Sequence, residues 1–442
     1  MNLEKSNMRE SSRTTSLFAA VLSAIVVFIG AANLLAAEGN WYRGCIHAHS
    51  LWSDGNTFPE LAAEDYRARG YHFLAFTEHN ILAQGERWRN VNAKKKPIPR
   101  QLMDKYLNRF GKDWVQTRGS GDSLQVRLKT LDEIRKVVEV PGSFIMIPGE
   151  EITGRFEDRQ VHVTALNVAE VIQPQKGSSV KDTINRDMVG IYEQKARLKR
   201  PMVGIVNHPN WPTFDIAARE LASARYARLV EFGNAGADCL FFGDENHPGT
   251  ERVWDIANTI RVSNMRFAPL FGTAADDAHD YLSTNPDRSD PGKAWIVVRA
   301  AELKPNAIVA AIARGDFYCS TGVRLRKADY DPKAGTLTVE VEPEEGVNYV
   351  IDFIGTLADY DRSSKTVDIQ GRRPHRVRHY SKDIGRMLTR VKGPKGMYRL
   401  TGQELFVRAT VYSSKPMAKP VKDGMQREQA WTQPIGWENR VK

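Results

Sequence analysis

Histidine and carboxylate residues gather in short motifs along the first two thirds of this 442-residue chain. The chain has only 10 histidines, and two of them lie two apart in GCIHAHSLWSDG, residues 44–55. Side chains at i and i+2 of a strand point to the same face, so His47 and His49 would present two imidazoles side by side. Such a pair can hold a transition metal, although the same spacing also suits the polar face of an ordinary strand.

The other motifs favour the metal-binding interpretation. They are FTEHN with His79, IPGEEIT with Glu150 and Glu151, VH with His162, VNHPN with His208, and TAADDAHD with Asp277 and His279. A lone histidine is usually a satisfied polar residue. Six of the 10 histidines in or at the ends of predicted strands are much harder to explain by structure alone. A mixture of imidazoles and carboxylates suits Zn, Mn or Fe.

The elements that must position these residues alternate between strands and helices from residue 41 to about 325. Strands are predicted at 43–49, 72–79, 143–151, 161–168, 201–209, 227–234, 267–274 and 293–300. A helix is predicted at 58–70, and a long amphipathic stretch covers about 83–140. The alternation indicates βα units and a mostly parallel sheet. In an α/β barrel the carboxyl ends of the strands converge on one mouth, which would bring the motifs together.

The pattern changes after about residue 325. Short β-like runs are separated by Gly, Pro and Asp turns, and no good amphipathic helix lies among them. These features predict a small antiparallel, sandwich-like β-domain at 326–442. Trp431 and Trp437 could serve there as sugar-stacking platforms, although packing roles are commoner for tryptophan. Contact with a polysaccharide or a protein through this domain is left open.

The N-terminus has the features of a secretory signal peptide at residues 1–37. Lys5, Arg9 and Arg13 precede an apolar run that extends from residue 17 to residue 37. The run is long and Leu35 occupies the −3 position, so an uncleaved membrane anchor is the alternative. Both interpretations predict an exported protein, periplasmic or extracellular, with membrane contact only through this segment.

The charge and the cysteines restrict the classes of partner. The net charge is +10, but Lys and Arg are spread along the chain and are dense only at 93–96 and 371–379. Together with export, this spread argues against a nucleic-acid partner and favours anionic substrates or surfaces. The three cysteines, Cys45, Cys239 and Cys319, have no CxxC spacing, and we expect them to be small apolar core residues.

The motifs HAHSLWSDG, FTEHN, GEEIT, VH, NHP and ADDAH, in this order, resemble those of the PHP (polymerase and histidinol phosphatase) family over about residues 41–325. The resemblance implies a distorted seven-stranded (β/α) barrel at 38–325, with a helical insertion at about 83–140 and two to three divalent ions. It implies that His47, His49, Glu151 and Asp277 bind the first ion. It assigns Asp54, His79 and His279 to the second, and His162, His208 and a bridging Glu151 to the third.

The choice of Glu151 and the residue before His79 are the two open points in this resemblance. Glu151 is preferred to Glu150 because the family's GxE pattern begins at Gly149. The family usually has TDH where this chain has Thr77-Glu78-His79. The histidine is the implied ligand, so this change falls on a neighbouring residue that can tune affinity and orientation. It leaves metal binding expected and the substrate preference open.

The resulting prediction is a metal-dependent hydrolase, most simply a phosphoesterase acting on a small anionic substrate. Divalent ions lower the pKa of bound water to near neutrality and neutralise charge that develops in the transition state. No Ser or Cys nucleophile is required. Asn80, Arg155 and Arg159 follow the ligand motifs closely and are candidates for holding a phosphate.

Two other functions compete with this prediction. The same ions could serve hydrolysis of carboxylic esters, amides or carbamates, although amidohydrolase barrels usually carry a bridging Lys and an isolated Asp. A non-catalytic binding protein on the same scaffold would be favoured if ligands were missing, and none is. His247 repeats the NHP string but follows a Gly- and Asp-containing loop, so it is left out of the predicted site.

Overall fold

The computed structural model describes residues 39–441 except 284, 286, 371–374 and 422–423. The predicted signal peptide or membrane anchor at 1–37 lies outside the described residues. Within the described ranges, no helix has both the length and the apolar character that a membrane crossing requires. Export therefore stays a prediction from the N-terminal sequence.

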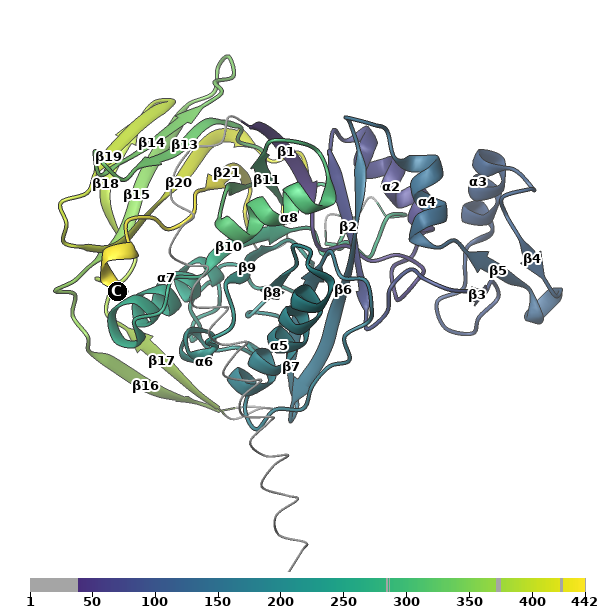
Figure 1. Cartoon of the computed structure of the whole chain (residues 1–442), viewed down its shortest axis with the longest axis horizontal. Helices are drawn as coiled ribbons and strands as arrows, with labels where there is room; N and C mark the ends of the chain where they lie inside the picture. Colours follow the sequence, from purple (N-terminus) through teal and green to yellow (C-terminus); the bar gives the residue numbers. More distant parts are fainter. Residues whose placement is uncertain (1–38, 284, 286, 371–374, 422–423, 442) are drawn as a thin grey trace, which may run out of the picture. The chain divides into compact units, whose positions relative to one another are not determined.

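Seven strands form the barrel that carries the histidine motifs (Figure 1). In spatial order they are β1 (Asn40–Cys45), β2 (Phe73–His79), β6 (Ile145–Phe156), β7 (Arg159–Leu166), β8 (Val203–Val206), β9 (Leu229–Asn234) and β10 (Phe271–Ala275). Neighbouring strands are parallel except around β7, which is antiparallel to β6 and to β8. The prediction of a mostly parallel, seven-stranded α/β barrel is confirmed.

The barrel closes just beyond the ends of β1 and β10. The Asp277 N–H donates to the His47 carbonyl at 3.0 Å, and the His49 N–H donates to the Ala278 carbonyl at 2.9 Å. A single bridge pairs Ala48 with Ala278. The two histidines were predicted within the first strand, but β1 ends at Cys45 and they lie on its extended continuation. The barrel is joined at this seam by the two motifs with the densest ligand chemistry.

Helices alternate with the strands of this region. They are α2 (Pro59–Ala68), α4 (Leu131–Val138), α5 (Val180–Leu198), α6 (Ala218–Ser223), α7 (Thr250–Ile260) with η2 (Arg261–Met265), and α8 (Pro305–Arg314). The helix α5 shows how the sequence sets these elements: Ser179 caps its N-terminus by accepting from the Asp182 N–H. Its buried face includes Ile184, Met188 and Ile191. All three cysteines are buried and free, as predicted.

The insertion between β2 and β6 contains more than helices. It comprises β3 (Arg87–Asn90), α3 (Arg100–Phe110), β4 (Thr117–Arg118), η1 (Gly121–Ser123), β5 (Gln125–Leu128) and α4. The strands form a three-stranded antiparallel sheet, β3-β5-β4, which the predicted helical insertion omitted. These strands are only two to four residues long, too short for the alternation of polar and apolar residues in β5 to indicate a strand.

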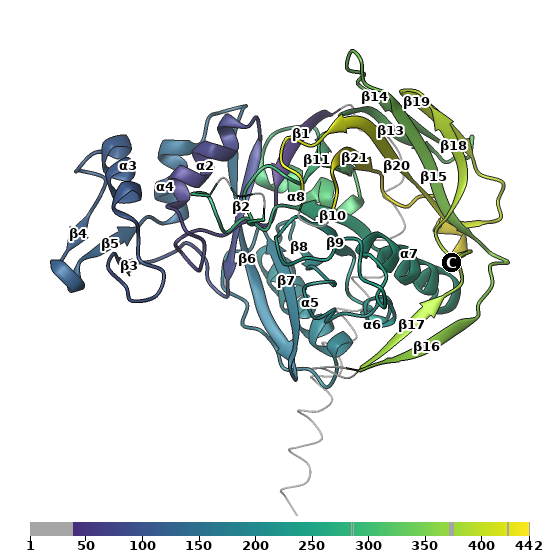
Figure 2. The ribbon, with the colours of Figure 1, turned by 180° about the vertical axis from the view of Figure 1, so that it is seen from behind.

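The sheet continues from the barrel into the C-terminal region through antiparallel strands (Figure 2). Next to β1 follow β11 (Trp295–Ala300), β12 (Phe317–Ser320), β21 (Arg427–Trp431), β20 (Glu404–Pro416), β15 (Tyr349–Leu357) and β18 (Arg386–Lys392). The predicted boundary near 325 falls at the start of the strand that follows β12, although β21 returns to pair with β12. The boundary itself stays a prediction.

Two smaller sheets complete this region. One contains β13 (Leu325–Asp331), β14 (Thr336–Val341) and β19 (Lys395–Arg399); the other is the hairpin β16 (Ser364–Ile369) and β17 (His375–Tyr380); and η3 (Glu438–Arg440) follows near the end. The antiparallel C-terminal strands are as predicted. Trp431 is buried in the core, and Trp437 is partly buried against it. Burial excludes Trp431 as an exposed sugar platform.

A buried ion pair ties α7 to β20. The Arg408 guanidinium donates to both Asp255 carboxylate oxygens, at 2.8 and 2.7 Å, and both side chains are almost wholly buried. Replacing Arg408 with Met would leave Asp255 buried without its partner. We expect this change to lower the free energy of unfolding by about 3–5 kcal/mol, measured by urea denaturation.

The matched control is Lys395→Met. Lys395 pairs with Glu340 at 3.4 Å, but its side chain is 68% exposed. Its loss should cost no more than about 1 kcal/mol. Equal losses in the two variants would contradict the importance of burial for the Arg408 pair.

Candidate metal centre

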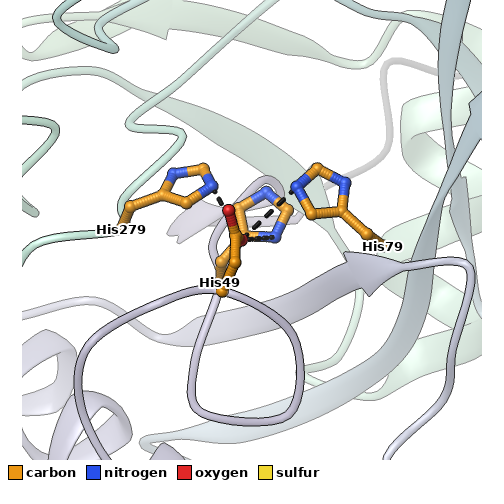
Figure 3. A group of neighbouring side chains, drawn as sticks. His49, His79 and His279 are labelled. Carbon is orange, nitrogen blue, oxygen red and sulfur yellow. Dashed lines mark ion pairs between the residues drawn. The ribbon is translucent and has the colours of Figure 1, made fainter. Parts of the chain in front are cut away.

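All nine predicted ligand residues come together at one end of the barrel. His47, His49 and Asp54 follow β1, His79 ends β2, Glu151 lies in β6, His162 in β7, His208 after β8, and Asp277 and His279 after β10. His162 sits early in its strand and still reaches the site because β7 runs opposite to its neighbours. Figure 3 shows the rings of His49, His79 and His279 converging from three separate stretches.

Three groups of side chains could each hold an ion. They are His49, Asp54, His79 and His279; His47, His49 and Asp277; and His47, Glu151 and His208, with the ligand atoms of each group within 4.8 Å of one another. The first group contains the second implied ion site, Asp54, His79 and His279, with His49 added, and the second group is the first implied site without Glu151. The third group differs from the third implied site in one ligand, because it contains His47 in place of His162. The His162 Nδ1 is 3.0 Å from Glu151 Oε1, so it contacts the shared carboxylate.

The group of His47, His49 and Asp277 fits a metal ion. The His47 and His49 Nε2 atoms are 3.1 and 3.2 Å from the same oxygen, Asp277 Oδ1. All three atoms are buried and lack a hydrogen-bond partner among the described residues. Unsatisfied buried polar atoms cost free energy, so their convergence needs a compensating partner. Imidazole nitrogen and carboxylate oxygen are the donors that first-row transition metals prefer.

Glu151 lies at the centre of the cluster. Its carboxylate contacts nitrogen atoms of His79 at 2.9 Å, His162 at 3.0 Å, His208 at 3.2 Å, His47 at 3.4 Å and His49 at 3.6 Å. Glu150 occupies the adjacent strand position and so points to the opposite face, where its Oε1 accepts from the Ile172 N–H at 2.7 Å. The structure thus brings Glu151 into the cluster and leaves Glu150 outside it.

Burial and charge act in opposite directions on these groups. Burial alone would lower the pKa of His47, but Asp277, Glu231 and Glu151 raise it well above its usual value. Burial would raise the pKa of Glu151, but the neighbouring His162 and His47 hold it well below its usual range. The pKa of His49 falls to about 3, because of burial and then of His279. Cation binding by this cluster would displace protons from the imidazoles.

The Asp54 side of the cluster is open to solvent. Its side chain is 38% exposed and those of His79 and His279 are 28% exposed, whereas His49 and Glu151 are almost fully buried. Asp54 Oδ1 lies 3.4 Å from His79 Nε2 and 3.1 Å from His279 Nε2. A Cβ at Gly55 would lie 2.6 Å from the His49 carbonyl, so the SDG turn needs glycine for this close approach. The cluster is therefore accessible to solvent on this side.

The sequence interpretation missed several residues that support the cluster. Glu231 on β9 is buried, and its Oε1 lies 2.8 Å from His47 Nδ1. Its Oε2 accepts from the Asn234 amide at 2.9 Å. Asn207 donates to Glu151 Oε1 at 2.8 Å. Such partners orient metal ligands. The available signal was the pair of polar residues in LVEFGN, an otherwise apolar predicted strand that ends beside the others.

Glu78, the residue that departs from the family pattern, holds the loop that carries His49 and Asp54. It is buried and accepts from the Ser50 N–H at 3.2 Å and from the Ser50 and Ser53 hydroxyls. Burial, with a further contribution from Asp54, raises its pKa to about 7. Its side chain thus supports two ligand residues, as expected for a position next to a ligand.

The three predicted phosphate-binding residues differ in their surroundings. Asn80 has φ 52°, and its amide exchanges hydrogen bonds with the Thr153 backbone at 2.8 and 3.1 Å. Arg159 donates to the Asp215 carbonyl at 2.8 Å and pairs with Glu220. These two side chains are therefore occupied in holding the local backbone, which argues against their predicted role. Arg155 is exposed and stays a prediction.

Comparison with protein-family profiles and with curated proteins finds no match for this chain. Among solved structures, it is similar to a two-domain protein from Bacteroides vulgatus that contains a predicted PHP-like metal-dependent phosphoesterase. The TM-score is 0.38 at 13% identity, and the match covers 90% of this chain and 96% of that chain.

A second solved structure, from Bifidobacterium adolescentis, is provisionally described as a metal-dependent phosphoesterase. Its TM-score is 0.31 at 14% identity, with 55% of this chain and 89% of that chain covered. At these identities the likeness concerns the fold, and the chemistry rests on the residues described above.

Proposed function

We propose that this protein is a metal-dependent hydrolase, and specifically a phosphoesterase that uses two or three divalent ions, Zn, Mn or Fe. The observation that carries the proposal is the convergence of buried imidazole nitrogens on Asp277 Oδ1, none with a hydrogen-bond partner among the described residues. Bound ions would supply a hydroxide nucleophile at neutral pH and would neutralise charge on the phosphoryl oxygens.

Different residues of the chain would form the buried part, the connecting carboxylate and the exposed part of the cluster. His47, His49 and Asp277 form the buried floor, and Glu231 orients the His47 ring through Nδ1. Glu151 connects this floor to the other groups. Asp54, His79 and His279 form the exposed side, where a phosphoester would meet the cluster. The rigid strand ends hold these side chains in place before the substrate arrives.

The cysteines support metal-based rather than thiol-based chemistry. All three are buried. Burial raises the pKa of Cys45 to about 12, and it raises the pKa values of Cys239 and Cys319 well above the usual range. A thiolate is needed for nucleophilic attack, and these thiols stay protonated near neutral pH.

The testing experiment combines metal analysis with hydrolysis assays on the purified metal-replete protein. The assays compare a phosphomonoester, a phosphodiester and a carboxylic ester at matched concentrations. We expect at least one tightly bound transition metal per chain and turnover of a phosphoester. Fewer than one ion per chain would overturn the metal centre. Turnover of the carboxylic ester alone would retain the metal centre and overturn the phosphoesterase assignment.

Removing the ions should lower stability as well as activity. An ion that binds the folded chain at about 1,000 times its Kd contributes about 4.1 kcal/mol of stability. We therefore expect chelation to abolish hydrolysis and to lower the Tm by several degrees, measured by calorimetry. Adding back Zn, Mn or Fe should restore both. An unchanged Tm after complete removal would show that the cluster is satisfied without ions.

Export and a small-molecule phosphoester as the substrate belong to the same proposal. They are supported by the N-terminal sequence and by the solvent-exposed side of the cluster, respectively. Fractionation of cells that express the full chain would test the first of these. Recovery of the protein from the cytoplasm would contradict it.

A further inference from the structure

A lysine of the insertion lies against the exposed side of the metal centre. The Lys96 ammonium is 3.5 Å from Asp54 Oδ2 and donates to the Asp54 carbonyl at 3.1 Å. Its side chain is 62% exposed to solvent. Lys96 belongs to the run AKKK at 93–96, which the sequence marks only as locally basic.

The loop that carries Lys96 is held at both of its ends by buried residues and a backbone hydrogen bond. Val91 and Ile98 flank it and are buried, and the Ile98 N–H donates to the Val91 carbonyl at 2.9 Å. Both residues belong to a core cluster that also contains Leu51 and Trp52. These two residues lie between His49 and Asp54 in the chain, so the basic loop and the ligand loop share one core. The packing therefore sets where Lys96 stands relative to Asp54.

A second contact strengthens this link. The Trp52 indole N–H donates to the Lys129 carbonyl at 2.9 Å, which joins the ligand loop to the far end of the insertion. The insertion is thus attached to residues 51–52 at both of its ends. This attachment makes it part of the site, although it contributes no predicted metal ligand.

The position of Lys96 suits an anionic substrate. A lysine ammonium has three donors, and the Asp54 carbonyl occupies one of them. Lysine acts as a point charge toward phosphate oxygens. An ester bound from the open side of the cluster would meet this charge next to Asp54, His79 and His279. A neutral ester would gain nothing from it.

We propose that Lys96 is a substrate-binding residue that holds a non-bridging phosphoryl oxygen, and that the insertion thereby determines preference for anionic over neutral esters. This inference rests on the proposed hydrolase function and deepens it. It replaces Asn80 and Arg159, whose side chains are occupied elsewhere, as the source of anion recognition.

The test compares Lys96→Met, Lys96→Arg and the matched control Lys95→Met in the full metal-loaded chain. Lys95 is an exposed neighbour in the same run. The probes are inorganic phosphate, by calorimetry, and nitrophenyl phosphate and nitrophenyl acetate, by steady-state kinetics. Metal content and Tm are measured for each variant.

We expect Lys96→Met to weaken phosphate binding and raise the KM for the phosphoester about fivefold, a modest effect because the ammonium is exposed. The kinetics on the acetate ester and the metal content should not change. Lys96→Arg should retain most of the affinity, and Lys95→Met should match the parent protein. The effect should shrink at high salt, because screening weakens exposed charges.

Three outcomes would overturn the inference: unchanged phosphate affinity in Lys96→Met, an equal loss in Lys95→Met, or loss of metal in Lys96→Met. The last would mean that Lys96 only supports Asp54. Failure of the proposed function looks different. If the parent protein hydrolyses only the acetate ester but binds phosphate through Lys96, the phosphoesterase assignment fails and the anion site stands.

Discussion

Replacing His49 with alanine is expected to abolish hydrolysis and to remove bound metal. His49 belongs to two of the three ligand groups, and its Nε2 atom is buried without a hydrogen-bond partner among the described residues. The substitution leaves the Asp277 carboxylate with only one of the two imidazoles that converge on its Oδ1. We expect kcat/KM to fall at least about 10³-fold, equivalent to about 4 kcal/mol of transition-state stabilisation. Asp277→Ala should have the same effect, since its Oδ1 is the point on which two imidazoles converge.

The control for both changes is His247→Ala. His247 repeats the NHP string of the His208 motif but contacts Asp244 at 2.8 Å and His375 at 2.7 Å, away from the ligand groups. Its variant should retain the metal content and the turnover of the parent protein. Equal loss in all three variants would show that the ligand assignment is wrong. Metal analysis by mass spectrometry and steady-state kinetics on one phosphoester would decide the question.

The second large effect is expected from a pair of adjacent carboxylates. Glu151→Gln should lower kcat/KM by at least about 10³-fold and reduce the number of ions per chain, because it removes the charge that faces five histidines. Glu150→Gln should stay within about threefold of the parent protein. The two substitutions are chemically identical and one residue apart, so any difference reports on strand geometry.

The expected tolerance of Glu150→Gln has a physical reason. Burial, with a contribution from Asp187, raises the pKa of Glu150 to about 8, so its carboxyl group is largely protonated near neutral pH. Glutamine resembles this neutral acid and can accept the same hydrogen bond from the Ile172 N–H. If Glu150→Gln loses metal and Glu151→Gln keeps it, the orientation of β6 would be wrong by one residue.

Local pattern predicted the barrel strands and the polar residues at their ends, and the family resemblance supplied the ligand set. A strand buried on both faces appears as a short apolar run, and a polar residue at its end is conspicuous. His79, His208 and Asp277 were found in this way. The insertion was harder, because β3, β4 and β5 are short, and the buried residues of β5 share a core with Leu51 and Trp52, which are distant in the sequence.

The sequence did not reveal the residues that contact the candidate ligands without being ligands themselves. Glu231 lies inside a predicted strand, where a single polar residue has several structural explanations. Only the pairing of β9 with β8 and β10 places it beside His47. Lys96 was also missed, although it lies in an exposed loop and not in a strand. Its basic neighbours indicate solvent exposure, and nothing local indicates that the loop returns to Asp54.

Donor chemistry and hydrophobic periodicity are local properties, so the amino-acid sequence indicates which side chains could bind a metal and which predicted strands they follow. Which of these donors meet is settled only in the folded chain. The seam that joins His47 and His49 to Asp277, the reversed direction of β7 that delivers His162, and the packing that sets Lys96 beside Asp54 all depend on contacts between distant segments. Such contacts form only when the barrel closes, so no local pattern encodes them.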